Sequence, residues 1–425
     1  MHITLVIPDL KGGGAERMVL NLAQGLIDRG HGIDIVLMRP LLDYVEEVPD
    51  DARLFYVDPV RGRSTIRDVA SPSARLQHLS QSAGGVNWLD TARAFDWDLL
   101  RCRPDLKLLN RARAIASYIA RETPDCVLPS LPRAKAATLM AARFLPEHPP
   151  IVPIVHNNYE RRRPRDRNRL RHLAPHAAHF VGVSRGAAER LAAVVGVPQE
   201  RITTIYNPVV TPALRKGAAD PAPHPWLRDS ATPVVLSAGR LEKAKDFPTL
   251  IKAFARLATR RPCRLIILGE GKQRENLQGL VHKLELDDRV VLPGWVDNPF
   301  AYMARASVFV VSSTYEGLSM VLVEALACGC PSVSTDCPSG PAEVLRDGKL
   351  GALVAVGDED GLAKAVEQVL DDPPEKRVLQ RRAEDFSVNV AATAYERLIR
   401  TLVAGAQDRP DPREGTDAHR GLRGE

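Results

Sequence analysis

The chain has 425 residues, of which 44% are hydrophobic and 5% aromatic, with 58 Lys and Arg against 52 Asp and Glu. This length and composition predict two globular domains, and they exclude a disordered polar chain, a collagen and a small disulfide scaffold. The net charge of +6 is unevenly distributed: residues 1–207 hold 29 basic and 22 acidic side chains, and the remainder holds 29 and 30. The basic excess of the first half is typical of a domain that binds an anionic partner, or of a sequence with GC-rich codon usage.

An apolar run at Ile3–Ile7 predicts a first strand, and it leads into a loop that contains Gly12, Gly13 and Gly14. Apolar positions at helical spacing follow over 18–27, and a second strand is expected at Ile33–Met38. A strand, glycine loop, helix and strand in this order begin a parallel doubly wound sheet. Further strands are expected at Cys126–Leu128, Ile151–Val155, His179–Val183 and Ile202–Tyr206. We interpret the arginine-rich region 58–121 as helices and loops inserted on this domain.

Five prolines between residues 208 and 230 predict a linker, after which the same plan restarts. Strands are expected at Val234–Ser237, Leu265–Leu268, Val290–Leu292, Val308–Val311 and Pro331–Ser334, and a helix at Phe247–Leu257. The sequence thus predicts an N-terminal acceptor-side domain (1–207), a linker (208–230) and a C-terminal donor domain (231–388). A helix at 389–405 is expected to pack back on the first domain, and 406–425 to form a disordered tail.

Cysteine usage and hydropathy predict the compartment. The six cysteines show no repeating spacing, so we expect reduced thiols in a cytoplasmic protein. Cys328, Cys330 and Cys337 cluster without a nearby histidine, which favours small core residues over a zinc site. No signal peptide and no run of about 18 apolar residues occur, so any membrane contact should be peripheral, at the inner face of the cytoplasmic membrane.

Two carboxylates in the second half give the sharpest chemical signal. Glu316 follows the predicted strand Val308–Val311, and Glu324 lies in the helix after it. Ligands bind at the carboxyl ends of strands in such sheets. The intervening Gly317, Leu318 and Ser319 would present backbone N–H groups at a helix N-terminus, where phosphate binds, and carboxylates beside them suit sugar hydroxyls.

A matching loop with two cations follows the first strand of this domain. Gly239 would let a ligand approach the backbone, and Arg240 and Lys245 would hold a diphosphate and neutralise its charge as it departs. A solvated basic loop is the alternative for this stretch alone. Its pairing with Glu316 and Glu324 at matching positions favours a ligand site.

These motifs resemble the donor-site signature of retaining group 1 glycosyltransferases with the GT-B fold. The resemblance covers residues 234–370 almost without a break, through the stretches 235–250, 268–271, 291–296, 312–317, 324–327 and 334–336. The first half is similar more loosely, at 12–16, 181–184 and 205–208. The resemblance implies two Rossmann-like domains that face a cleft, and a transfer from a nucleotide sugar without metal or cofactor.

The resemblance also implies a role for each site residue. Arg240 and Lys245 would bind the donor diphosphate, Glu324 the ribose and Glu316 the transferred sugar, and His156 would lie near that sugar. Donor contacts would come from Gly12, Gly13, Gly14, Gly239, Gly269, Gly271, Gly317, Leu318 and Ser319. The stretch 291–296, which includes Trp295 and Val296, would line the nucleobase pocket. A lone histidine after a buried strand could equally be structural.

Two mechanisms can retain the configuration at the anomeric carbon. A double displacement needs a carboxylate below the anomeric carbon, and Glu316 is the only candidate. The family's geometry places Glu316 on sugar hydroxyls, which favours front-side attack with the leaving diphosphate helping to deprotonate the acceptor. The cations and a helix N-terminus can replace a metal ion. The metal-type pattern Asp96-Trp97-Asp98 lies in the inserted region, away from these motifs.

Other functions are weaker. A nicotinamide dehydrogenase would need G-x-G-x-x-G spacing, which Gly12–Gly14 lacks. A sugar-nucleotide epimerase of the same two-domain plan would need the diphosphate site without an acceptor. A nucleic-acid-binding protein is a distant alternative, because the basic segment 161–171 has seven arginines but no interleaved aromatics.

The basic segment follows His156 and borders the expected acceptor side. Asn157, Asn158, Arg161, Arg162 and Arg163 are therefore expected to contact a lipid-linked acceptor or an anionic membrane surface, with a solvated charged face as the alternative. The sequence thus predicts a retaining, metal-independent glycosyltransferase that moves a hexose or N-acetylhexosamine from a nucleotide sugar, with UDP the commonest donor nucleotide in the family. The acceptor would be a glycan or lipid-linked precursor of a surface polysaccharide or glycolipid.

Overall fold

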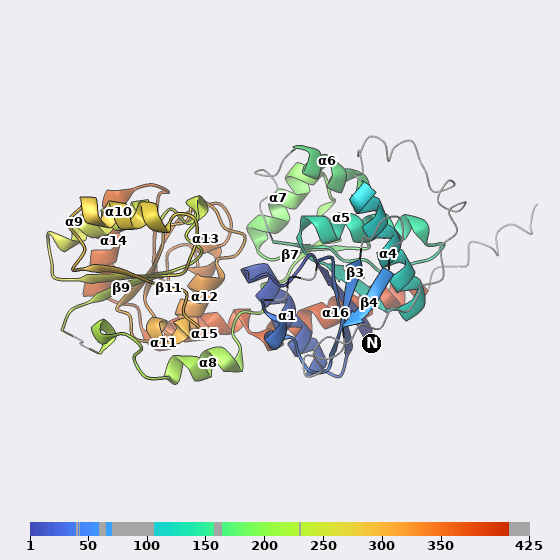
Figure 1. Ribbon diagram of the computed structural model, residues 1–425, viewed down its shortest axis with the longest axis horizontal. Helices are drawn as coiled ribbons and strands as arrows, with labels where there is room; N and C mark the ends of the chain where they lie inside the picture. The colour runs from blue at the N-terminus through green and yellow to red at the C-terminus, as the bar shows by residue number, and fades with distance from the viewer. Residues whose placement is uncertain are drawn as a thin grey trace, which may run out of the picture.

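The computed structural model describes residues 1–39, 41, 43–58, 65–69, 106–156, 164–228 and 231–407. They form two α/β domains side by side, the first on the right and the second on the left of Figure 1. Each domain is built on a sheet of mainly parallel strands with helices on its faces. This confirms the fold class predicted from the sequence, two doubly wound α/β domains.

The sheet of the first domain has the order β4-β3-β2-β1-β5, and all its neighbours are parallel except β3 and β4. Isolated bridges from Val127 to Ile151 and from Ser130 to Ile154 continue it into a smaller sheet of order β6-β7-β8. The strands are β1 His2–Ile7, β2 Gly32–Leu37, β3 Ala52–Asp58, β4 Thr65–Val69, β5 Cys126–Pro129, β6 Ile154–Val155, β7 Phe180–Gly182 and β8 Ile202–Thr204.

The second domain repeats this plan in one parallel sheet of order β11-β10-β9-β12-β13-β14. Its strands are β9 Val234–Ala238, β10 Arg264–Leu268, β11 Val290–Gly294, β12 Val308–Val311, β13 Ser332–Thr335 and β14 Ala352–Val354. β12 and β13 are buried along their whole length because helices cover both faces. β12 (VFVV) therefore reads as a continuous apolar run, whereas β13 (SVST) combines one valine with three buried hydroxyl residues.

Each sheet has a point where the strand order reverses. It lies between β1 and β5 in the first domain and between β9 and β12 in the second. Ligands of open parallel sheets bind in the crevice outside the carboxyl ends of the strands at such a point. The loops after β1, β9 and β12 carry Gly12–Gly14, Arg240 and Glu316, so the fold brings the predicted site segments to these positions.

Helices complete the layers. In the first domain these are α1 Gly14–Ile27, α4 Leu106–Glu122, α5 Leu131–Ala141, α6 Pro164–Leu173 and α7 Arg185–Val195. In the second they are α9 Phe247–Ala258, α10 Arg274–Lys283, α11 Pro299–Met303, α12 Met320–Ala327, α13 Pro341–Val344, α14 Glu359–Asp371 and α15 Lys376–Ala383. None of the described helices is long and apolar enough to cross a bilayer.

The chain passes between the domains twice. The proline-rich segment 208–230 contains the helix α8 Pro212–Ala219, because Pro212 occupies a first-turn position that tolerates proline and the Thr211 hydroxyl accepts from the Leu214 N–H. On the return, α16 Val388–Gln407 lies along α1 of the first domain (Figure 1). A bridge between Val210 and Ser387 joins the two crossings.

Candidate active site

The loops after β9 and β12 meet in an ion pair at the carboxyl edge of the second sheet. Lys245 Nζ lies 2.7 Å from Glu316 Oε1, and the Ser313 hydroxyl donates to the same oxygen at 2.7 Å. Ser312 Oγ donates to the Lys245 carbonyl at 2.8 Å, which ties the two loops together. The side chains of Lys245 and Glu316 remain 24% and 12% exposed, so the pair is open to a ligand.

Glu324 lies on α12, the helix that follows Glu316, and its side chain is buried, with 7% of the residue exposed. Burial raises the pKa of its carboxyl group, and the positive charges of Arg17 and Lys245 oppose that shift. Arg17 belongs to α1 of the first domain, so both domains contribute charge at Glu324. A partly desolvated carboxylate flanked by cations is suited to accept hydrogen bonds from the hydroxyls of a ligand.

Arg240 has no such tight partner within the part of the chain that the structure describes. Its guanidinium is 65% exposed and lies 3.6 Å from Glu242 in a loose surface pair. Its own loop packs closely on the next one: Gly269 has φ +126°, and a Cβ there would lie 2.1 Å from the Gly239 carbonyl oxygen. Only glycine can occupy that position. The closely packed loops therefore hold Arg240 at the surface, where its guanidinium can contact an anion.

The loop between Glu316 and α12 ends in a buried hydroxyl. Ser319 is the residue before α12 and is 1% exposed, and its Oγ has no hydrogen-bond partner among the described residues. A buried polar atom without a partner costs stability unless a ligand or water satisfies it. Together with the N–H groups of the first turn, this hydroxyl would suit a phosphate or a sugar oxygen.

The first domain closes the other side of this site. Gly14 packs against Met320 at the start of α12, since a Cβ on Gly14 would lie 3.1 Å from the Met320 sulfur. Glu16 follows on α1; burial raises the pKa of its carboxyl, Asp9 raises it further, and Arg240 of the other domain lowers it. The glycine loop and the first turn of α1 therefore face the donor-side cations.

His156 lies after β6 and is 8% exposed. Its Nε2 is 2.5 Å from the Ser130 hydroxyl. Burial, with a smaller effect from the charge of Lys135, lowers the pKa of His156 to about 3. The imidazole is therefore neutral near pH 7, where it can form hydrogen bonds but cannot act as a charged acid.

The predicted nucleobase segment, residues 291–296, covers most of β11 and the two residues after it. Trp295 is 59% exposed, and Val296 is half-buried against the core. Beside them, Arg274 forms an ion pair with Glu270 at 2.6 Å and donates to the Leu292 carbonyl. Trp295 is therefore an exposed aromatic residue next to the loop after β10, whose Gly269 N–H donates to the Gly294 carbonyl.

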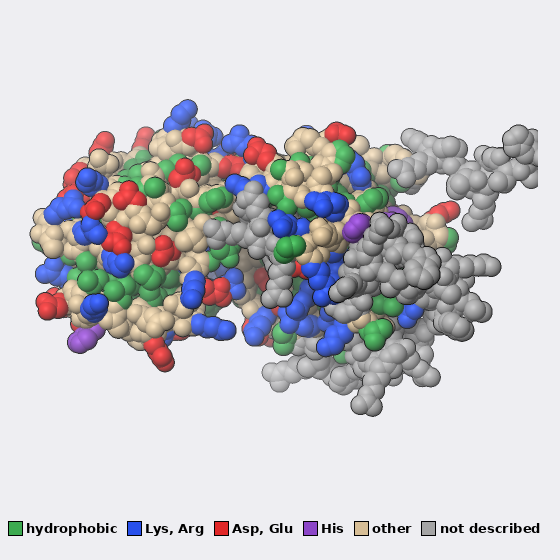
Figure 2. All heavy atoms as spheres, turned by 90° about the horizontal axis from the view of Figure 1, so that it is seen from above, with side chains coloured by type: hydrophobic (Ala, Val, Ile, Leu, Met, Phe, Trp, Pro, Cys, Tyr) green, Lys and Arg blue, Asp and Glu red, His purple; other side chains and the backbone are tan. Residues whose placement is uncertain are grey.

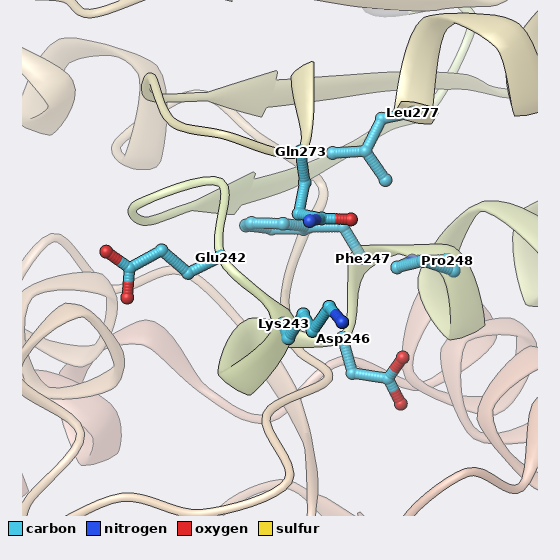
Figure 3. A pocket seen from close by; sticks show the side chains of 7 residues that line it. All are labelled: Glu242, Lys243, Asp246, Phe247, Pro248, Gln273 and Leu277. Atoms are coloured by element: carbon cyan, nitrogen blue, oxygen red, sulfur yellow. The ribbon is translucent and has the colours of Figure 1, made fainter. Parts of the chain in front are cut away.

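A separate cavity of about 190 Å³ lies on the outer side of the 240–246 loop (Figure 3). Its lining residues are Glu242, Lys243, Asp246, Phe247, Pro248, Gln273 and Leu277. Neither Arg240 nor Lys245 lines it. The predicted site residues Gly14, Arg240, Lys245 and Glu316 lie instead on the loops after β1, β9 and β12, where Gly14 approaches Met320 of the other domain.

Several predicted residues lie outside the described part of the chain. These are Asn157, Asn158, Arg161, Arg162, Arg163 and the Asp96-Trp97-Asp98 pattern. Among the residues that the structure does describe, no three His, Cys, Asp or Glu side chains gather as they would around a metal ion. Cys328, Cys330 and Cys337 are buried, and burial raises the pKa of each thiol.

The structure adds residues that the sequence did not single out. Ser313 completes the hydrogen bonds of Glu316, and Arg17 contributes charge at Glu324. Ser313 lies three residues before Glu316 in a motif already recognised, so its spacing could have indicated it. Arg17 could not be found in this way, because its role depends on how the domains face each other.

Two family models match complementary parts of the chain. The model of glycosyl transferases group 1 matches residues 222–386, and that of Glycosyltransferase Family 4 matches residues 12–211. An N-acetylgalactosamine-N,N'-diacetylbacillosaminyl-diphospho-undecaprenol 4-alpha-N-acetylgalactosaminyltransferase from Campylobacter jejuni is 34% identical over 50% of this chain and 56% of its own. The lipopolysaccharide core biosynthesis glycosyltransferase LpsE from Rhizobium meliloti is 39% identical over 39% of this chain and 49% of its own. The alignments thus span about half the length of these curated relatives.

Solved structures share the fold over nearly the whole chain. Anabaena HepE in complex with UDP and glucose superposes with a TM-score of 0.68 at 18% identity, covering 94% of this chain and 100% of that one. The lipopolysaccharide outer core galactosyltransferase WaaB gives 0.65 at 18% identity, with 96% and 100% covered. The two family models and this two-domain architecture agree with the motifs of the donor domain. The chain belongs to the group 1 glycosyltransferases and has their GT-B fold.

Proposed function

We propose that this protein transfers a hexose or N-acetylhexosamine from a nucleotide sugar, with UDP the expected nucleotide, to a glycan or lipid-linked acceptor. The observation that carries the proposal is the Lys245–Glu316 pair, open to solvent and adjacent to the buried Glu324 and the exposed Arg240. The two cations are suited to bind a diphosphate. The two carboxylates are suited to accept hydrogen bonds from the ribose and the transferred sugar, which flank the diphosphate in a nucleotide sugar. Curated relatives named for lipopolysaccharide and lipid-linked glycan synthesis support a role in surface glycans.

The Lys245–Glu316 ion pair would be exchanged for contacts to the donor when the donor binds. In the structure, the Lys245 ammonium donates to the Glu316 carboxylate. An arriving diphosphate would compete for Lys245, because two phosphate groups carry more charge than one carboxylate. Glu316, still held by Ser313, would then be free to accept hydrogen bonds from the transferred sugar.

The proposed reaction retains the anomeric configuration by front-side attack. The acceptor oxygen bonds to the anomeric carbon on the face that the diphosphate leaves. The carbon–oxygen bond to the diphosphate breaks, and the acceptor proton moves to a phosphate oxygen of the leaving group. Arg240, Lys245 and the α12 N-terminus stabilise the charge that develops there. No step requires a metal ion or cofactor, and neutral His156 serves only as a hydrogen-bonding group beside the sugar.

Product analysis tests this function. The protein is incubated with a panel of UDP- and GDP-sugars, with and without a lipid-diphosphate glycan acceptor. We expect nucleoside diphosphate to be released in a strictly acceptor-dependent manner. An epimerase would convert the nucleotide sugar without acceptor and without net release of nucleoside diphosphate, which would overturn the proposal.

We also propose that the protein works at the cytoplasmic face of an anionic membrane, through the basic segment 161–171. Its described part is α6, which carries four arginines against one acid and is exposed at Arg165. Arg171 is already engaged, donating to the Val194 carbonyl at 2.9 Å. Lys and Arg side chains also gather on the first domain beside the domain junction (Figure 2). The acceptor part of the Campylobacter relative's name, a diphospho-undecaprenol, is a lipid of this kind.

Vesicle co-sedimentation tests the membrane proposal. The protein should bind phosphatidylglycerol vesicles and not phosphatidylcholine vesicles. Replacing Arg161, Arg162 and Arg163 together by Ser should weaken binding by at least ~10-fold, since each charge near such a surface contributes about 1 kcal/mol. Equal binding to both vesicle types, or no change in the triple variant, would contradict it.

A further inference from the structure

Three loops interlock where the domains meet. Ser184 and Arg185 begin α7 in the first domain, and the loops 317–319 and 339–343 belong to the second domain. A Cβ on Gly186 would lie 2.8 Å from Ser339 Oγ, and one on Gly340 (φ +98°) would lie 3.2 Å from the Ser319 amide nitrogen. The three loops are therefore packed so closely that a side chain added at either glycine would force its neighbours to shift.

A hydroxyl of the first domain binds the loop 316–319 of the second domain, which is the donor loop of the proposed function. Ser184 is fully buried, and its Oγ donates to the Gly317 carbonyl at 2.7 Å while it accepts from the Ala187 N–H at 3.1 Å. Gly317 directly follows Glu316. Because the C=O and N–H of a trans peptide point in opposite directions, this bond also fixes the direction of the Leu318 N–H.

A carboxylate of the second domain holds the helix that carries Ser184. Glu343 is 7% exposed, and its two oxygens accept from the Arg185 N–H at 2.8 and 3.0 Å, at the positive end of α7. The Arg185 guanidinium adds a contact at 3.2 Å. Burial and the nearby Glu343 carboxylate together raise the pKa of Tyr206. Behind it, Arg382 donates to the Glu343 carbonyl at 2.6 Å and fixes the residue from the second-domain side.

We propose that Ser184 and Glu343 form an interdomain clasp that positions the donor loop. Glu343 anchors α7 to the second domain, and Ser184 then orients the Gly317–Leu318 peptide beside Glu316. Both are positioning residues, since neither needs to touch the substrate. The effect on turnover rests on the proposed glycosyl transfer, whereas the clasp itself can be measured without any substrate.

The test uses the full chain with Ser184→Ala and Glu343→Gln. Glu189→Gln is the matched control, since Glu189 is an exposed acid on the same helix. Both clasp variants should show at least ~10-fold faster hydrogen exchange in a peptide spanning residues 314–319. Their kcat should fall by about 10- to 100-fold, the scale expected for a misplaced catalytic group, with donor KM changed by less than about 3-fold. Ser184→Thr, which keeps the hydroxyl, should restore slow exchange.

The outcomes separate the two proposals. Unchanged exchange in folded clasp variants would overturn the clasp. Faster exchange with unchanged kcat would overturn its positioning role. Loss of thermal stability in proportion to loss of activity, with Glu189→Gln behaving in the same way, would also overturn that role. A wild-type protein that transfers no sugar would reject the proposed function, and the exchange result would still decide whether the clasp exists.

Discussion

Lys245 and Glu316 are the residues on which the proposed chemistry depends most. Lys245→Ala removes a charge that would stabilise the leaving diphosphate, and Glu316→Gln removes the carboxylate that would hold the sugar. Each variant should lower kcat by at least ~100-fold, the scale of lost charge stabilisation. Steady-state kinetics measure this, with Lys243→Ala as the control, because Lys243 is exposed on the same loop and lines the outer cavity. Near-normal turnover in either variant would refute the assignment.

At this scale the sequence predicted which residues of the second domain lie together better than it predicted contacts between the domains. Glu316, Glu324, Arg240 and Lys245 follow strand ends in motifs of fixed spacing, and the fold brings them to one edge of one sheet. The clasp residues and Arg17 could not be predicted in this way. Their contacts join segments more than 100 residues apart across two domains, and local spacing contains no information about such pairs.

Among the elements, α16 shows how the end of the chain stabilises its beginning. It lies so close to α1 that a Cβ on Gly25 would come 2.5 Å from Val388 Cγ1 and 3.0 Å from Ala392 Cβ. Arg29 of the first domain forms a 2.5 Å ion pair with Glu396 on α16. Arg29 and Arg400 lower the pKa of Glu396 to about 2. The C-terminal helix is therefore an integral part of the first domain.

A pair of glycine substitutions tests this helix contact. Gly25→Ala should destabilise the protein by about 1–3 kcal/mol through overpacking. Gly279 on α10 has nothing within 4 Å of an added Cβ, so Gly279→Ala should stabilise it by about 0.5–1 kcal/mol. Thermal unfolding followed by circular dichroism compares the two variants. A higher midpoint for Gly25→Ala than for wild type would contradict the packing described here.

The sequence predicted elements well where burial is continuous. Runs of apolar residues indicated β1, β2, β9, β10 and β12, which have helices on both faces. β3, β4 and α8 were not recognised, whereas α4 agrees with the helices expected in region 58–121. The interpretation of 58–121 as helices and loops alone was wrong at β4, which pairs antiparallel with β3. Charged residues interrupt the apolar pattern in and beside this region, and in α8 the prolines that suggested a linker begin a helix.

For the whole molecule, the two sheets and their facing loops explain why the charge is distributed unevenly. The near-neutral second half carries the donor-side cations Arg240 and Lys245, each balanced locally by a glutamate. The basic first half carries the segment proposed to face an anionic acceptor. Under the proposed function, the net charge would mark the acceptor side, and the donor site could be found only through residue spacing.

The most direct test of the central claim is a proton NMR time course with a UDP- or GDP-sugar and a lipid-diphosphate glycan acceptor. We expect a new glycosidic anomeric signal, with the same anomeric configuration as the donor, to grow together with free nucleoside diphosphate. Both signals should be absent without acceptor, and both should grow at least ~100-fold more slowly in Lys245→Ala. Inverted product, or nucleotide-sugar conversion that needs no acceptor, would refute retaining glycosyl transfer.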